Sequence, residues 1–290
     1  MKTIEVDILV PAYNGYDDLV ALVARFHTQR YIQINNIVVP ITKTNNKNEE
    51  QLKRFCEENH IITFDVEPWY FSHSMTRQRA IKKYCTSDIV ILFSQDVRLI
   101  NDMAFYNLVK DIANGECVYA YGRQICPKKS IEKYIREKNY PIYSYFVSAE
   151  DVQRMQIMAF FSSDAFSALN RNVFIEINGY MNFDVMMGED MIYSYNAIVH
   201  GYRKKYCGDA VVIHWHRYSF RQLYKRYYDT GKFYNEVKIF DGYHSSESGA
   251  KLAMYVLKRC LKEFYIVGLI RWLPDMFMRY LGMKRGRNIK

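Results

Sequence analysis

The C-terminal region of the sequence lacks an apolar run long enough to form a membrane-spanning helix. The longest such run between residues 251 and 283 is FYIVGLI, residues 264–270, and Pro274 follows it. A spanning helix needs about 20 consecutive apolar residues, and a proline interrupts a helical pattern. We therefore expect residues 241–290 to form a basic, amphipathic helical extension that lies on a membrane surface or packs on protein.

Cysteine pairs at the CxxC spacing are also missing, as are internal repeats and low-complexity segments. The six cysteines are scattered along the chain, and because a strand pattern begins at once, we expect no secretory signal. We expect free, mostly buried thiols in a reducing, cytoplasmic setting.

Net positive charge is nearly absent outside the C-terminal region. The whole chain carries +9, from 40 Lys and Arg against 31 Asp and Glu. Residues 251–290 hold ten basic and two acidic residues, a net of +8, which leaves +1 for residues 1–250. A nucleic-acid binder needs basic residues spread over one face, so the nearly neutral body argues against nucleic acid as a partner.

What the sequence does contain is an alternation of apolar runs and helical patterns over its first hundred residues. The runs in VDILVPAYNG, NNIVVPI, IITFDV and DIVILFSQD are typical of short buried strands. This alternation predicts an α/β fold with a mostly parallel sheet covered by helices on both faces. It weakens from about residue 115. We expect one large domain over residues 1–240, followed by the extension over 241–290.

Two polar segments, residues 11–15 and 94–96, stand at the carboxyl ends of predicted strands, where such sheets bind ligands. A carboxylate at a strand end, Asp96, can hold a hard divalent cation beside a phosphate-bearing ligand. The alternative is a loop or helix-capping aspartate.

Further candidate ligands for this metal site lie in HWHRYS, which places His214 and His216 at i and i+2. In an extended strand both would point to one face. Asp96, one imidazole and two diphosphate oxygens would form a shell for Mg²⁺ or Mn²⁺. Arg217 and the basic residues after it suit a diphosphate. The alternative is that both histidines are packed or face solvent.

Adjacent carboxylates, Glu189 and Asp190, begin a helical pattern in GEDMIYSY, where they favour the positive end of the helix dipole. Asp190 is our candidate general base, which takes the proton from an acceptor hydroxyl, and Glu189 supports it. The alternative is a pair of solvated acids that only stabilise the helix.

HSMTRQRA supplies Arg77 and Arg79, which lie two apart and therefore do not share a helix face. We predict that Arg77, in the first turn and nearer the sheet edge, faces the ligand.

Together these segments resemble the family-2 glycosyltransferases with the GT-A fold, and more narrowly the bacterial rhamnosyltransferases. The matching segments occur in family order and span residues 4–231: VDILVPAYNG, FSHSMTRQRA, FSQDV, YGRQ, SSDAFSALNRNVFIEINGY, GEDMIYSYNAIVHGYRKKY and AVVIHWHRYSFRQLYKRYYDTG. The resemblance implies an inverting transferase that uses a nucleotide-sugar donor and a divalent metal, Mg²⁺ or Mn²⁺.

The resemblance also implies residue roles. Asp96 would hold the metal, His214 or His216 would complete its shell, and Asp190 would be the catalytic base with Glu189 beside it. The donor nucleotide and diphosphate would contact Pro11, Ala12, Tyr13, Asn14, Arg77, Gln95 and Arg217.

The donor implied by the rhamnosyltransferase branch is dTDP-L-rhamnose. Ser94 stands at the first position of the DXD-like element, as is usual in that branch, whereas VVPITKTNN lacks the acidic residue common in the family, and Asp164 replaces a usual Asn. A UDP- or GDP-sugar donor is the alternative.

The implied acceptor is a growing or lipid-linked cell-surface polysaccharide, met at the inner membrane surface by a peripheral protein on its cytoplasmic face. A homodimer is a further expectation. A non-catalytic sugar-nucleotide or glycan-binding protein is the alternative of another class, and donor hydrolysis or transfer would exclude it.

Overall fold

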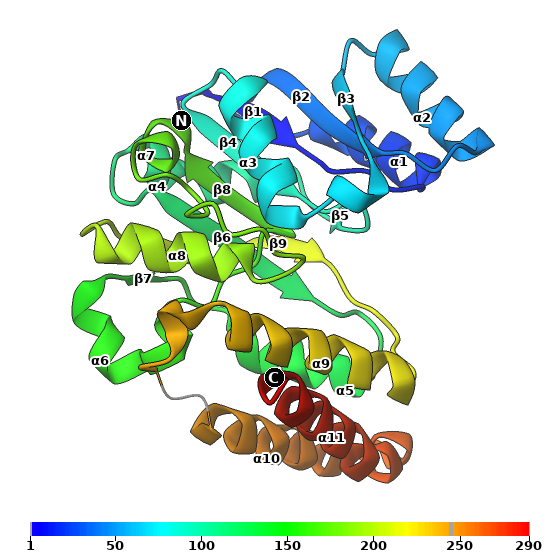
Figure 1. The fold of residues 1–290 in the computed structure, drawn as a ribbon, viewed down its shortest axis with the longest axis vertical. Helices are drawn as coiled ribbons and strands as arrows, with labels where there is room; N and C mark the ends of the chain where they lie inside the picture. The colour runs from blue at the N-terminus through cyan, green and yellow to red at the C-terminus, as the bar shows by residue number, and fades with distance from the viewer. Residues whose placement is uncertain (1, 244–245, 290) are drawn as a thin grey trace. The chain divides into compact units, whose positions relative to one another are not determined.

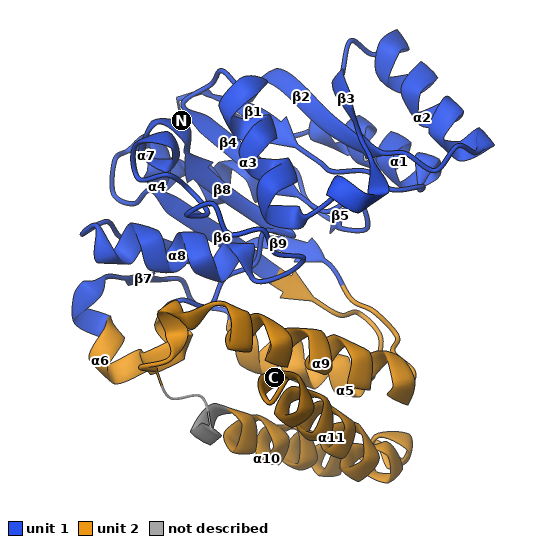
Figure 2. Cartoon of the chain, in the orientation of Figure 1, with its two compact units in different colours: residues 1–123, 142–151, 160–214 blue, residues 124–141, 152–159, 215–290 orange. Residues whose placement is uncertain are grey.

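The computed structural model describes residues 2–243 and 246–289. These residues form two compact units, which Figure 2 distinguishes by colour. The first unit comprises residues 1–123, 142–151 and 160–214, and the second comprises residues 124–141, 152–159 and 215–290. The expected division into a domain over 1–240 and an extension over 241–290 stays a prediction.

The first unit opens with alternating strands and helices. The strands are β1 (Ile4–Leu9), β2 (Ile32–Thr42), β3 (Ile62–Val66) and β4 (Ile89–Phe93), and the helices are α1 (Tyr16–Phe26), α2 (Lys47–Glu58) and α3 (His73–Lys83). The four strands pair in parallel in the order β3-β2-β1-β4. This confirms the parallel sheet that the alternation predicts.

Antiparallel strands complete the sheet. The further elements of this part are β5 (Arg98–Leu99), α4 (Ala104–Ala113), β6 (Tyr119–Ile125), β7 (Tyr145–Val147), β8 (Phe166–Asn170), α7 (Arg171–Glu176), α8 (Glu189–Val199) and β9 (Lys204–Ile213). Among the described residues, nine strands form one sheet in the order β3-β2-β1-β4-β8-β6-β9-β5, with β7 on β9. Because antiparallel neighbours need no crossover helix, the regular alternation weakens after residue 115.

Helices cover both faces of this sheet (Figure 1). On one face, Phe26 of α1 and Phe105 of α4 pack in a cluster with Ile8 of β1. On the other, Tyr193 of α8 packs in a cluster with Leu9. Successive residues of β1 thus pack into the hydrophobic clusters on opposite faces of the sheet, as expected when a strand is buried on both faces.

All six cysteines are free and buried, as predicted. Burial raises the pKa of the Cys56 thiol to about 11 and that of the Cys85 thiol to about 12. Thiols in such surroundings stay protonated and unreactive.

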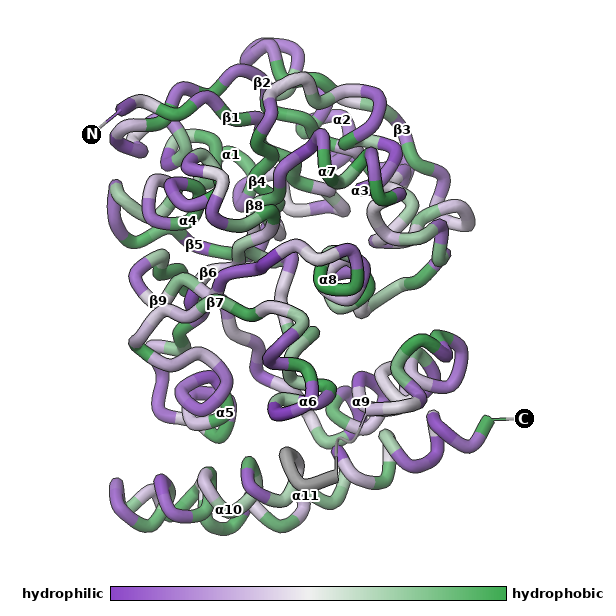
Figure 3. Tube along the Cα trace, turned by 90° about the vertical axis from the view of Figure 1, so that its left-hand side faces the viewer, coloured by the Kyte–Doolittle hydropathy of each residue, from purple (hydrophilic) through white to green (hydrophobic). Residues whose placement is uncertain are grey.

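The second unit is helical. Its helices are α5 (Ile131–Asn139), α6 (Val152–Met155), α9 (Phe220–Glu236), α10 (Ser246–Lys262) and α11 (Ile266–Arg287). The expected pair of C-terminal helices is therefore present as α10 and α11, and Figure 3 shows apolar and polar residues alternating along both. Short 3₁₀ turns lie at Gln156–Ala159 and Lys238–Phe240 of this unit, and at Pro68–Tyr70 and Ala149–Asp151 of the first unit.

Glycines allow α9 and α11 to pack closely. A Cβ atom at Gly282 would lie 2.5 Å from the carbonyl oxygen of Tyr224, and one at Gly286 would lie 2.1 Å from that of Tyr228. Pro274 lies inside α11, although the sequence pattern predicts an interruption there. A helix tolerates a proline in its interior where tertiary packing offsets the missing N–H donor. None of the helices in the described ranges is long and apolar enough to cross a bilayer.

Candidate functional site

The loop after β1 carries four of the predicted nucleotide-binding residues. Ala12 extends the pairing with β2, since its N–H donates to Pro40 O (2.8 Å) and its own carbonyl accepts from Thr42 N–H (2.9 Å). Beyond it the backbone of Asn14 turns into the left-handed region. Tyr13 is 61% exposed. A loop of this kind offers a flat aromatic surface beside a strand end.

Gln95 fastens this loop to the segment after β4. Its Oε1 accepts from Tyr13 N–H at 2.8 Å, and its Nε2 donates to Asn14 O at 2.5 Å. A side chain at Gly15, where φ is 101°, would collide with the Gln95 amide. Gln95 therefore acts on the loop backbone, and its neighbour Asp96 is left exposed.

Asp96 and His214 form the candidate metal pair of the first unit. The short strand β5 runs antiparallel to β9, with Arg98 opposite Ile213, so Asp96, two residues before Arg98, meets His214, one residue after Ile213. The distance from Asp96 Oδ2 to His214 Nε2 is 3.4 Å. One carboxylate and one imidazole this close suit a divalent cation such as Mn²⁺.

The histidines differ from the expectation in one respect. β9 ends at Ile213, so His214 and His216 lie beyond the strand, and the rule that i and i+2 share a strand face does not apply to them. His214 belongs to the first unit, whereas His216 and Arg217 belong to the second, where both line a pocket.

Arg77 is buried in an ion-pair network. α3 begins at His73, so Arg77 lies beyond its first turn, on the buried face, with 2% of its surface exposed. It pairs with Glu189, and its Nη2 donates to Asp164 O at 3.3 Å. That Arg77 also faces a ligand stays a prediction. Arg79 is exposed and stacks over Phe64, so the two arginines occupy different faces, as predicted.

Asp164 is the centre of this network, and the sequence pattern noted it only as a departure from the family. Its carboxylate accepts hydrogen bonds from three buried hydroxyls: Tyr119 (2.7 Å), Ser167 (2.6 Å) and Tyr180 (2.8 Å). It lies 3.6 Å from Arg77. A buried carboxylate with this many donors has a fixed position, so its surroundings are fixed as well.

Asp190 lies at the edge of the network, in the first turn of α8. Its Oδ1 accepts from Met191 N–H at 2.7 Å, and its Oδ2 lies 3.4 Å from Asp164 N–H. The residue is partly exposed. Desolvation, and then the charges of Glu189 and Asp164, raise the pKa of Asp190 well above that of an ordinary aspartate. A partly accessible carboxylate with a raised pKa is a stronger base than an exposed one.

Glu189 has a different environment from its neighbour. It is 5% exposed and bound to Arg77. Burial raises the pKa of Glu189 to about 7, and the Arg77 charge acts in the opposite direction. Its position suits a supporting role, because the carboxylate is already engaged.

Lys204, at the start of β9, is a charged residue that sequence reasoning missed. It is fully buried, and its Nζ donates to Phe161 O at 2.6 Å. Burial lowers the pKa of Lys204 well below its usual value, while the charge of Asp190 acts in the opposite direction. No local pattern marks it, because KKY at a strand start is ordinary sequence.

Comparison with known proteins adds an independent line of evidence. Residues 7–178 match the family described as "Glycosyl transferase family 2". The chain is 27% identical over 290 residues to the O-antigen chain rhamnosyltransferase RfbN of Salmonella typhimurium, which covers 98% of this chain and 90% of that protein. It is 29% identical over 236 residues to the O-antigen chain rhamnosyltransferase WbaN of Salmonella anatum, covering 79% and 73% respectively.

Among solved structures, the chain resembles the mannosyltransferase PcManGT from Pyrobaculum calidifontis in complex with GDP-Man and Mn²⁺. The TM-score is 0.61 at 15% identity, and the match covers 97% of this chain and 85% of that one. At such identity the similarity concerns the fold.

Proposed function

This chain belongs to glycosyl transferase family 2 and has the GT-A fold, and from that premise we propose that it is an inverting, metal-dependent rhamnosyltransferase. Its donor would be dTDP-L-rhamnose, and its acceptor a growing or lipid-linked cell-surface polysaccharide. Enzyme class and relationship to rhamnosyltransferases are given by the family match and the O-antigen relatives. What we propose beyond these is the identity of the donor and of the acceptor, the dependence on a metal and the inverting stereochemistry.

The environment of Asp190 is the observation that carries the proposal. Single displacement needs one base that removes the proton of the incoming hydroxyl while the donor diphosphate departs. Asp190 is partly accessible, has a raised pKa and is held by Met191 N–H. Glu189 cannot take the same role without giving up Arg77. We assign Asp190 as the base and Glu189 as its support.

Asp96 and His214 are the residues we assign to a divalent metal. They offer an exposed carboxylate and an imidazole 3.4 Å apart, and the solved mannosyltransferase that shares the fold carries Mn²⁺. We propose His216, two residues along the chain, as a third ligand. The metal would neutralise charge that develops on the leaving diphosphate.

The donor nucleotide is assigned to the loop after β1, with Pro11, Ala12, Tyr13 and Asn14 as its lining. The exposed ring of Tyr13 can stack on a base, and Gln95 keeps the loop in place through two backbone contacts. Because Arg77 is bound to Glu189, we assign it to positioning that carboxylate. A UDP- or GDP-sugar remains the alternative donor.

The experiment is a titration of the full chain with dTDP, dTDP-rhamnose, UDP- and GDP-sugars, with and without Mn²⁺ or Mg²⁺, together with a transfer assay. Metal-dependent binding of dTDP-rhamnose is expected. Asp190→Asn should reduce transfer by a factor of about 10² to 10⁴ while donor binding is kept, and Asp96→Ala should remove the metal dependence of binding. Equal turnover of Asp190→Asn and wild type would disprove the base assignment.

Peripheral membrane association belongs to the same proposal. The exposed side chains of α11 form a stripe at intervals of three and four residues: Ile266, Ile270, Leu273, Phe277 and Tyr280. Basic residues end the helix. An apolar stripe with a cationic C-terminal end suits an anionic bilayer surface, so we propose that the protein lies on the cytoplasmic face of the membrane. A homodimer through the same stripe is the alternative.

A further inference from the structure

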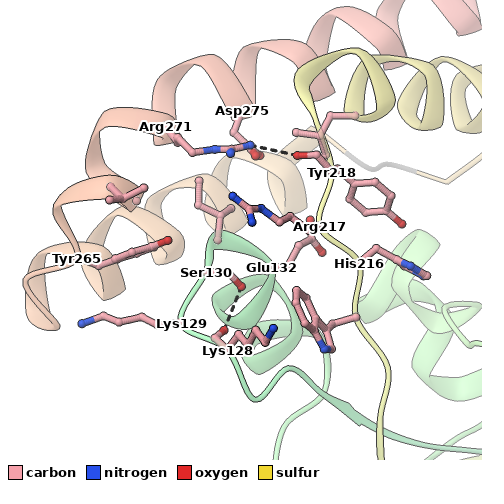
Figure 4. Close-up of a pocket in the computed structure, with 15 residues that line it drawn as sticks. Lys128, Lys129, Ser130, Glu132, His216, Arg217, Tyr218, Tyr265, Arg271 and Asp275 are labelled. Atoms are coloured by element: carbon pink, nitrogen blue, oxygen red, sulfur yellow. Dashed lines mark hydrogen bonds between the residues drawn. The ribbon is translucent and has the colours of Figure 1, made fainter. Parts of the chain in front are cut away.

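The second unit contains a pocket whose lining includes His216, the proposed third metal ligand, and four cationic side chains to which the proposed function gives no role. It has a volume of about 290 Å³ and lies among the start of α5, residues 215–218 and the first half of α11. Four cationic side chains line it: Lys128, Lys129, Arg217 and Arg271. Figure 4 shows Arg217 extending into the middle of this group.

The acidic side chains of the pocket do not cancel these charges. Glu132 and Asp275 both line it, and both are bound to Arg279, with Asp275 Oδ1 2.6 Å from Arg279 Nε. Counting Arg279, the group has five cations against two carboxylates. The pocket therefore attracts an anion with more than one charge.

The positions of two cations are fixed by contacts within the unit. Arg271 Nη2 donates to Tyr218 O at 3.1 Å, and its guanidinium lies over the Phe220 ring. Lys128 lies over the ring of Trp215 at 5.1 Å. Each retains further N–H donors for a ligand, because an ammonium has three and a guanidinium five.

One wall of the pocket continues into the exposed apolar surface of α11. Val267 and Gly268 line the pocket, while the adjacent Ile266 and Ile270 are 69% and 72% exposed. An anionic group in the pocket would thus sit next to a surface suited to a hydrocarbon chain. Both features together describe an amphiphile with a polyanionic head.

We propose that this pocket binds the diphosphate of a lipid-linked acceptor, with the lipid chain along the apolar stripe of α11. The inference rests on the proposed function, since only a lipid-linked glycan joins a diphosphate to both an apolar chain and a sugar acceptor. It assigns Arg217 to the acceptor diphosphate instead of the donor. The pocket would hold the lipid end of the acceptor and select lipid-linked over free glycans.

The test uses farnesyl diphosphate, a soluble short-chain polyprenyl diphosphate, titrated into the full chain by calorimetry. We expect the wild-type chain to bind it. The affinity of Lys128→Ala/Arg271→Ala should be at least about tenfold lower, because two charge-assisted hydrogen-bond donors are lost. Arg285→Ala removes a matched arginine of α11 outside the pocket and should bind as wild type. Arg271→Lys keeps the charge and should keep most of the affinity.

Farnesol and inorganic pyrophosphate separate the two halves of the ligand. Pyrophosphate should bind more weakly than farnesyl diphosphate but with the same sensitivity to Lys128→Ala/Arg271→Ala, and farnesol should be insensitive to it. Thermal melting followed by circular dichroism checks that the variants fold. Unchanged affinity in a folded double variant would overturn the proposal.

Competition identifies other sources of the same chemistry. Displacement of farnesyl diphosphate by dTDP would make the pocket part of the donor site, and equal competition by phosphatidylglycerol vesicles would make it a general lipid-headgroup site; either overturns the assignment. Donor binding should be intact in the double variant. If dTDP-rhamnose binds and farnesyl diphosphate does not, this inference fails while the proposed function stands. If farnesyl diphosphate binds and dTDP-rhamnose does not, dTDP-L-rhamnose is removed as the donor, while the lipid-linked acceptor and its pocket are retained.

Discussion

Glu189 and Asp190 are adjacent in sequence, yet their carboxylates have different partners. Glu189 is enclosed and paired with Arg77, and Asp190 is partly exposed and receives only backbone N–H groups in the hydrogen bonds described. Helix geometry accounts for this, because successive residues point about 100° apart around the axis. Position in the helix therefore separates the support from the base.

The raised pKa of Asp190 predicts the pH dependence of transfer. A general base works only when deprotonated, so the rate should rise with pH through the raised pKa, above the range of an ordinary aspartate. In Glu189→Gln one of the charges that raise this pKa is lost, so the rising limb should move to lower pH. Rate profiles of kcat for both proteins measure this. A rising limb at the same pH in the wild type and in Glu189→Gln would contradict this prediction.

Removing Arg77 should destabilise the fold strongly. Arg77→Met leaves Glu189 and Asp164 buried without their counter-charge, and breaking a buried pair costs about 3–5 kcal/mol in the free energy of unfolding. Adding Glu189→Gln should recover part of this loss. Urea unfolding measures the variants.

Arg79→Ala is the matched control for Arg77, because Arg79 lies on the same helix but is exposed over Phe64. It should change the unfolding free energy by no more than about 0.5 kcal/mol. If both arginine variants behaved alike, the network would not hold the helix as described.

At the scale of elements, the contact between α9 and α11 depends on glycine. A Cβ at Gly286 would meet backbone atoms of α9, whereas a Cβ at Gly249 in α10 would meet nothing within 4 Å. Gly286→Ala should therefore cost about 1–3 kcal/mol of stability, and Gly249→Ala should gain up to about 1 kcal/mol. Thermal unfolding compares the two; a loss at Gly249 equal to that at Gly286 would refute the packing argument.

The exposed stripe of α11 yields a prediction for membrane binding. Leu273→Asp/Phe277→Asp places two charges where the side chains are 66% and 55% exposed, so it should lower binding to vesicles of anionic phospholipid by about tenfold or more without unfolding the protein. Ile142→Asp, an exposed apolar residue of the first unit, is the control. Pelleting unchanged in the double variant, with a dimer lost instead, would assign the stripe to a second copy.

At the scale of the whole molecule, the sequence is informative where structure follows local order. The parallel strands and the strand-end positions of Asn14 and Asp96 follow from apolar runs and the loops after them. The partners of those residues do not. Asp96 meets His214 only through the register of β5 on β9, and Arg77 meets Asp164, 87 residues away, only once the sheet has formed. Such pairings between distant residues cannot be predicted from local sequence patterns.

The burial of all six thiols has a practical consequence for following the motions of the chain. Cys126 and Cys260 lie in the second unit and the other four in the first. Because only a thiolate reacts with alkylating reagents, each buried cysteine stays unlabelled until the structure around it opens. Labelling rates at the two sets of native cysteines therefore report whether the two units open by local unfolding together or separately, without any introduced probe.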